Sequence, residues 1–170
     1  MKLYKLTDKN GYTRPGAANA CKWGRNVTHK GTGKGELCGP GYIHAYLSPE
    51  LAVLLNPAHA NYKSPRLYEA SGVIIKTDGQ TKVGCLSLKT TKRIKLPKVT
   101  TNQLAAFAIL CALEVYNDKD FVRWALDYLS GKDRTQKAAD AAYAAARAAA
   151  NTAANKPLKL IKIAKQAMGY

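Results

Sequence analysis

The hydrophobic pattern of the chain changes its period near residue 100. Before that point, short runs of alternating apolar and polar residues are separated by glycine, proline, Asn-Gly and Asp-Gly, which is typical of strands joined by turns. The runs that predict strands are Leu3–Leu6, Tyr42–Leu47, Leu67–Ile75, Thr81–Leu88 and Thr91–Leu96. Beyond that point, apolar residues recur at helical spacing. We therefore expect an α+β fold, in which a twisted, mainly antiparallel sheet precedes the helices.

Two helices are predicted directly after the strands. Thr100 and Gln103 fit a capping box, in which each side chain satisfies a backbone N–H group at the start of the helix. Asp118 fits the cap of a second helix, and Ser130-Gly131 fits its end. Both helices carry apolar residues on one face, so we expect them to pack against each other.

The C-terminal part of the chain has a different composition. Residues 135–155 are mostly alanine, which predicts one long helix because alanine is the strongest helix former. After Pro157, LKLIKIAKQAM predicts a basic amphipathic helix that docks on the domain, on another subunit or on an anionic surface. Its expected apolar face consists of Leu158, Ile161, Ala164 and Met168. We therefore expect an α+β core domain over residues 1–133 and a helical part over residues 134–170.

The segment CGPGYIHAYLSPELAVLL contains the most specific candidate site. Gly39-Pro40-Gly41 predicts a tight bend before a strand. Tyr42, His44 and Tyr46 then occupy alternate positions, so their side chains should point to one side of that strand. Ser48 fits the cap of a short helix, whose free N–H groups suit a phosphate or a carboxylate.

Aromatic side chains beside free N–H groups suit a nucleotide, because a base can stack on a ring. The residues expected to bind such a ligand are Tyr42, His44, Tyr46, Ser48 and Trp23, the last from a glycine-rich segment of residues 13–41. An ordinary histidine pKa near neutrality would let His44 bind phosphate or transfer a proton. The alternative is that this face packs beneath the glycine-rich segment, with its polar atoms hydrogen-bonded inside the protein.

The chain is strongly basic, with 27 lysine and arginine residues against 11 aspartate and glutamate residues and a formal net charge of +16. Such an excess disfavours a compact monomer unless a polyanion or an acidic partner offsets it. The residues expected to contact nucleic acid lie in two stretches without acids: Lys89, Lys92, Arg93, Lys95, Lys98, Lys159, Lys162 and Lys165. The alternative is that these residues only keep the protein soluble.

The four cysteines are widely spaced, which favours free thiols. A zinc site would have to join Cys21, His29, Cys38 and His44, whose spacing differs from that of known zinc motifs. We therefore expect neither a metal nor another cofactor. No apolar run is long enough to span a bilayer, and the N-terminus is too polar for a secretory signal, which favours a cytoplasmic protein.

Several stretches of the chain resemble an uncharacterised family of bacteriophage proteins. The most specific is GELCGPG-x-IHAY at residues 35–46. The others are YKLTDKNGY, W-x₃-V-T-H, SPELAVLLNP-x-HANY, PRLYEASG, KVGC, LP-x-VTT, FAILCALEVY and WALDYLSGKDR. The resemblance extends over roughly residues 3–134. It implies a phage origin, with the protein in the host cytoplasm or the virion, and no established activity.

The layout is also similar to that of small ADP-ribosyltransferase-like domains. The shared order is a strand with Tyr4-Lys5, the stretch HAYLSPELA, and a strand that holds Glu69. This analogy implies a split antiparallel sheet around a cleft for a nicotinamide dinucleotide. Lys5 stands where those domains carry a histidine or arginine, so the analogy gives His44, Lys5 and Glu69 as catalytic candidates.

Three functions follow from these patterns. The one we favour is a non-enzymatic phage accessory protein that binds a polyanion, either nucleic acid or a nucleotide, through its lysines and the aromatic and histidine pocket. The second is an enzyme, or the relic of one, that acts on a nucleotide such as NAD. The third is a structural component of a virion or a homo-oligomer that assembles through the C-terminal helix.

Overall fold

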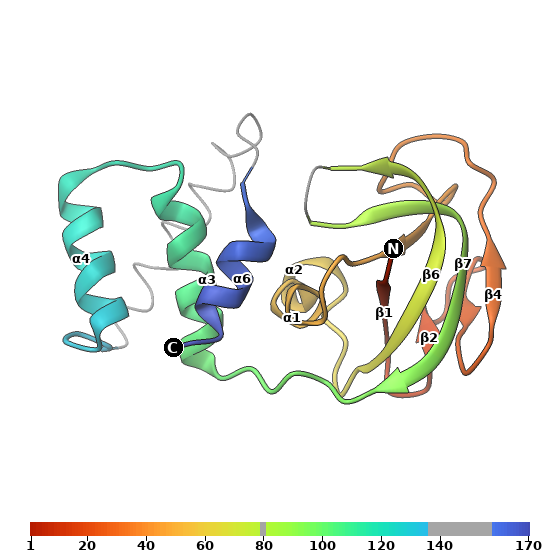
Figure 1. Ribbon diagram of the computed structural model, residues 1–170, viewed down its shortest axis with the longest axis horizontal. Helices are drawn as coiled ribbons and strands as arrows, with labels where there is room; N and C mark the ends of the chain where they lie inside the picture. The colour runs from red at the N-terminus through yellow and green to blue at the C-terminus, as the bar shows by residue number, and fades with distance from the viewer. Residues whose placement is uncertain (79–80, 136–157) are drawn as a thin grey trace. The chain divides into compact units, whose positions relative to one another are not determined.

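The computed structural model describes residues 1–78, 81–135 and 158–170 (Figure 1). The chain forms two compact units, residues 1–98 and 99–170. An antiparallel sheet and helices confirm the α+β class. The division into units falls where the hydrophobic pattern changes its period, whereas the expected boundary is at residue 133. The expected long alanine-rich helix lies outside the described residues.

The first unit is built mainly of strands. Its elements are β1 (Leu3–Thr7), β2 (Tyr12–Thr13), β3 (Cys21–Lys22), β4 (Thr28–Lys30), β5 (Ile43–Ala45), α1 (Pro49–Leu54), α2 (Asn56–His59), β6 (Arg66–Thr77) and β7 (Val83–Ile94). The main sheet has the order β1-β6-β7-β4, and β5 also pairs with β7. All of these pairs are antiparallel, as predicted, and β2 and β3 form a separate small ladder.

The main sheet closes on itself. Tyr4 and Tyr46 exchange two backbone hydrogen bonds of 2.9 and 2.8 Å, which join β1 to the residue after β5. The strands β1, β6, β7 and β5 therefore form a closed ring. Figure 1 shows β6 and β7 curving together along their length. Three register shifts between Glu69 and Lys76 fit this curvature, because such irregularities bend a strand.

Two apolar clusters fill the first unit. One consists of the buried residues Leu3, Trp23, Ile43, Ala45, Ala70, Val83, Cys85 and Leu88. The other consists of Leu6, Tyr46, Ala52 and Leu67, and so includes a residue of α1. Because neighbouring side chains of a strand point to opposite faces, Lys5 shares the face of Leu3 rather than that of Leu6. A lysine is thus directed toward apolar surroundings.

The helix after the candidate strand begins as predicted. The Ser48 hydroxyl accepts a hydrogen bond from the Leu51 N–H group at 3.0 Å, and Pro49 takes the first helical position. Helix α1 ends with its C-cap at Leu55, directly before Asn56-Pro57, and a second short helix, α2, begins there. Proline is compatible with a helix start because its missing N–H group would have no partner there.

The second unit contains α3 (Thr101–Leu113), α4 (Lys119–Ser130) and α6 (Leu160–Ala167). Helices α3 and α6 lie side by side (Figure 1), and the Gln103 side-chain amide donates a 2.8 Å hydrogen bond to the Met168 carbonyl. The buried residues of α6 are Leu160, Ile163, Ala164 and Ala167, so the expected apolar face is right only at Ala164. Helix α6 therefore packs within its own unit. No helix in the described ranges is both long and apolar enough to cross a bilayer.

The capping box of α3 gives a first testable prediction. The Thr100 hydroxyl accepts from the Gln103 N–H group at 3.2 Å, and the Gln103 side chain accepts from the Thr100 N–H group at 2.9 Å. We expect Thr100→Ala to lower the free energy of unfolding by about 1 kcal/mol, because it leaves an N–H group without its partner. Urea unfolding followed by far-ultraviolet circular dichroism measures this. Thr101→Ala, one residue later and exposed, is the matched control, and an equal loss there would contradict the prediction.

Candidate functional site

A cavity of about 140 Å³ lies in the first unit. Trp23, Tyr42, His44 and Tyr46, four of the expected ligand-binding residues, all line it. The catalytic candidate Lys5 lines it as well. The alternation in the IHAY stretch therefore places three side chains beside one cavity, from a strand whose regular part is only Ile43–Ala45.

The polar atoms of this aromatic face are already used inside the protein. The Tyr42 hydroxyl donates to the Gly33 carbonyl at 2.7 Å, and the His44 Nε2–H group donates to the Leu37 carbonyl. Both carbonyls belong to the glycine-rich segment. Tyr42 and His44 thus pack beneath the glycine-rich segment, which is the alternative that the sequence left open. Both residues still border the cavity.

The aromatic rings offer little open surface to a ligand. Trp23, Tyr42 and Tyr46 are 3%, 3% and 8% exposed. Trp23 donates through Nε1 to Thr13 Oγ1 at 3.0 Å, and the Tyr46 ring stacks on the His59 ring at 5.9 Å between centroids. A base needs an accessible ring face to stack, so this arrangement holds the cavity wall together rather than presenting a stacking platform.

His44 is a neutral group in this setting. Burial lowers its pKa to about 4, against the effect of the Leu37 hydrogen bond, and Lys5, Lys82 and Arg14 lower it further. The expectation of a histidine pKa near neutrality is therefore wrong at this position. At neutral pH the imidazole keeps its proton on Nε2, because the Leu37 carbonyl can only accept a hydrogen bond. It does not supply a positive charge to the cavity.

Lys5 is the most unusual group of the site. Its residue is 7% exposed, and its ammonium donates to the His44 carbonyl at 2.6 Å and lies 5.0 Å from the centre of the Trp23 ring. None of the ion pairs found in the described ranges includes it. Burial lowers its pKa to about 8, so most of the ammonium remains charged at neutral pH. A buried charge without a counter-charge is costly.

Two further cationic residues, Arg14 and Lys82, line the cavity. Neither is among the site residues expected from the sequence. Arg14 has a backbone φ of 52°, and its guanidinium donates to the Gly39 carbonyl at 3.3 Å. The Lys82 N–H group donates to the Asp78 carboxylate at 3.2 Å. The described residues that line the cavity include no aspartate or glutamate. Three cationic side chains therefore share a cavity without an acidic partner.

Ser48 does not line the cavity. Its hydroxyl is engaged in capping α1, and the residue is 6% exposed. Since α1 has six residues, its N-terminus is a weak site for an anion. Ser48 therefore caps α1 and lies outside the cavity in which it was expected to bind a ligand.

Glu69 lies away from the cavity. The register pairs Lys5 with Tyr68 and Tyr4 with Glu69, which places Glu69 on the opposite face of the strands from Lys5. Its carboxylate lies 3.4 Å from the Lys2 ammonium and 3.7 Å from the Lys92 ammonium. The structure thus brings two of the three catalytic candidates together and separates the third.

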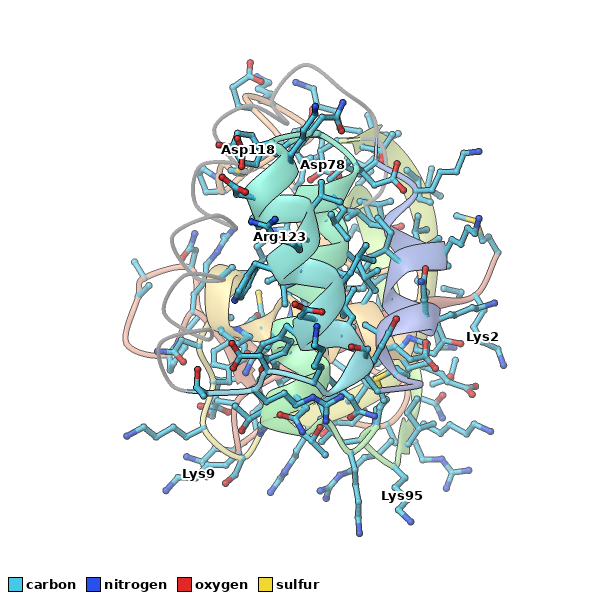
Figure 2. All side chains as sticks on the ribbon, turned by 90° about the vertical axis from the view of Figure 1, so that its left-hand side faces the viewer. Lys2, Lys9, Asp78, Lys95, Asp118 and Arg123 are labelled. Atoms are coloured by element: carbon cyan, nitrogen blue, oxygen red, sulfur yellow. The ribbon has the colours of Figure 1, made fainter. Side chains whose placement is uncertain are left out.

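The basic residues expected to contact nucleic acid are exposed in both units. We call Lys89, Lys92, Arg93, Lys95 and Lys98 the β7 basic segment, and Lys159, Lys162 and Lys165 the α6 lysines. Figure 2 shows the Lys95 side chain extending away from the ribbon. Only Lys92 of the β7 basic segment belongs to an ion pair within the described part of the chain. The charged side chains of this segment are therefore exposed to solvent and mostly unpaired within the described residues.

All four cysteines are free thiols, as predicted. No group of three or more metal-ligating side chains occurs within residues 1–78, 81–135 and 158–170. No family model, curated protein or solved structure matches the chain.

Proposed function

We propose that this chain is a non-enzymatic phage accessory protein that binds nucleic acid through the β7 basic segment. The observation that carries the proposal is that five basic side chains within ten residues are exposed. Among the described residues, Glu69 is the one acid paired to them. Lysine and arginine side chains that face solvent in this density neutralise phosphates and release their counterions. The phage setting comes from the family resemblance of the sequence.

The catalytic alternative has less support. Glu69 lies on the far side of the strands from Lys5, and His44 is neutral with its Nε2 proton engaged. A transferase acting on a dinucleotide would also need more room, because sites for drug-sized ligands have volumes of roughly 300 Å³ or more. Assembly through the alanine-rich C-terminal helix concerns residues outside the described ranges, and the following helix α6 buries its own apolar face within its unit.

Salt dependence tests the proposed function. We expect single-stranded DNA to bind at low salt, with an affinity that falls linearly on a double logarithmic plot as salt increases. Replacing Lys89, Arg93, Lys95 and Lys98 with glutamine should lower the slope by about 3, because each phosphate contact contributes about 0.7 on single strands. Fluorescence anisotropy at several salt concentrations measures both quantities.

A charge-matched variant controls for net charge alone. Lys9, Arg25, Lys63 and Lys119 are exposed and lie outside the β7 basic segment. Replacing them with glutamine changes the total charge by the same amount, and the slope should stay near that of the unaltered protein. Equal losses in both variants would show that binding follows net charge rather than this segment.

A further inference from the structure

The lining of the cavity carries an excess of positive charge that an anionic ligand can neutralise. Lys5, Arg14 and Lys82 line it, and none of the described lining residues is acidic. Two carboxylates, those of Asp78 and Asp8, act on the lining residues His59 and Tyr62 from outside the cavity. The three cations act together on His44, whose pKa each of them lowers. Such a convergence of like charges is unfavourable in the free protein, and an anion in the cavity would offset it.

Two of these residues are held in unfavourable states that suggest a role in binding. Lys5 is buried, and its ammonium donates to a neutral carbonyl, that of His44. Arg14 has a positive φ, a conformation that residues other than glycine rarely adopt and that is often found at functional sites. Neither arrangement is needed to close the strand ring, which depends on the backbone of Tyr4 and Tyr46.

The size of the cavity limits the ligand. A volume of about 140 Å³ is several times that of one water molecule in the liquid, about 30 Å³, yet well below that of a site for a whole nucleotide. A phosphate monoester suits this space and charge, because it carries close to two negative charges and its oxygens match the donors of arginine. An internal phosphodiester suits it less, since its chain must leave the cavity in two directions.

We propose that the cavity is a binding site for a terminal phosphate group, with Lys5, Arg14 and Lys82 as its cationic ligands. The phosphate comes from the 5′ end of a nucleic-acid strand or from a free phosphate ion, which have this chemistry in common. The inference rests on the proposed function only where it concerns the strand end. In that case the β7 basic segment binds the strand and the cavity binds its end.

The experiment compares two oligonucleotides of one sequence, one with a 5′-phosphate and one with a 5′-hydroxyl, by fluorescence anisotropy. We expect the phosphorylated strand to bind about tenfold more tightly, a typical gain for charge-assisted hydrogen bonds to one group. Lys5→Met and Arg14→Gly should each bring the two affinities close together. Glycine accepts a positive φ without strain, so Arg14→Gly keeps the fold even if Lys5→Met perturbs it.

Lys9→Met is the matched control, because Lys9 is exposed and its replacement removes the same charge. It should keep the preference for the phosphorylated strand. A second arm measures the shift in melting temperature when inorganic phosphate replaces chloride at equal ionic strength. A shift that Lys5→Met and Arg14→Gly abolish, with both strands bound alike, assigns the cavity to free phosphate and supports the site.

The outcomes separate the two proposals. If neither strand binds at low salt, the nucleic-acid function fails, and the inorganic phosphate arm still decides about the cavity. If the strands bind with equal affinity and phosphate gives no shift, the cavity is not a phosphate site, whatever the β7 basic segment does. A preference or a shift that persists in both Lys5→Met and Arg14→Gly would also overturn the proposal.

Discussion

Lys5→Met should make the ligand-free protein more stable at neutral pH by about 2 kcal/mol. The pKa of Lys5 falls from 10.5 to about 8 in the folded protein, chiefly because of burial, and this corresponds to a cost of about 3 kcal/mol for keeping the ammonium charged. Methionine removes that cost and fills a similar volume. It also removes the hydrogen bond to the His44 carbonyl, and this loss destabilises the variant by about 1 kcal/mol.

The stabilisation should shrink as the pH rises. Below about pH 8 the amine carries its proton in both the folded and the unfolded protein, so the full cost is present. Between about pH 8 and 10.5 the folded protein releases this proton before the unfolded protein does, and stability then rises with pH. The methionine variant lacks this gain. The groups that act on the Lys5 amine are Cys21, Arg14 and Cys85.

Urea unfolding of both proteins at neutral pH and at about pH 10 measures the difference. Burial raises the pKa of Cys85 to about 11 against the opposing effect of Lys5, so the thiol keeps most of its proton at the higher pH with or without the lysine. Lys9→Met, at an exposed position, should change the stability little at either pH. A Lys5→Met protein less stable than the unaltered one at neutral pH would mean that the ammonium has a favourable partner.

Local features of the fold could be read from the sequence because neighbouring residues determine them. The cap at Ser48, the capping box at Thr100 and the end of α4 at Gly131, with its φ of 82°, each involve residues a few positions apart. The apolar stripe of α4 is also local, and its spacing predicts Phe121, Trp124, Ala125, Tyr128 and Leu129. The last three are buried, and Phe121 and Trp124 are half-buried. Such signals require no knowledge of the rest of the chain.

Contacts between distant residues could not be read in this way. The sequence predicted two strands where β7 is continuous, because the polar Lys89-Thr90 pair interrupts the apolar pattern. Thr90 is fully buried, and its hydroxyl donates to the Gly24 carbonyl at 2.7 Å, more than sixty residues away in the chain. In the sequence alone, a threonine such as Thr90 therefore resembles a turn residue, because its distant hydrogen-bond partner is not visible there.

The candidate site shows the same limit. The alternation of Tyr42, His44 and Tyr46 predicted a shared face, and the structure places all three beside the cavity. The sequence contains no signal that Arg14 and Lys82 join Lys5 there, since the closed ring of strands brings them together. The charge of the cavity, on which its proposed chemistry depends, is therefore a property of the fold.

Gly41→Ala should disrupt the covering of this site and cost about 3 kcal/mol, at the upper end for overpacking. A Cβ atom on Gly41 would lie 1.9 Å from the Lys34 carbonyl oxygen, and backbone cannot move aside as a flexible side chain does. The Gly41 carbonyl also accepts from the Gly33 N–H group at 2.9 Å. The added methyl group therefore forces residues 31–41 away from β5, and Tyr42 and His44 lose their acceptors on that segment.

Hydrogen exchange and the urea midpoint together measure this effect. The Gly33 amide should exchange much faster in Gly41→Ala, and the midpoint should fall as the cavity loses its cover. Gly24→Ala is the control in the same glycine-rich segment, because its Cβ would meet the nearest atom, on Val27, at an ordinary 3.6 Å. If Gly41→Ala kept both the midpoint and the Gly33 protection of the unaltered protein, the segment could not be packed as closely as these contacts require. The Tyr42 and His44 hydrogen bonds would then not hold the site closed.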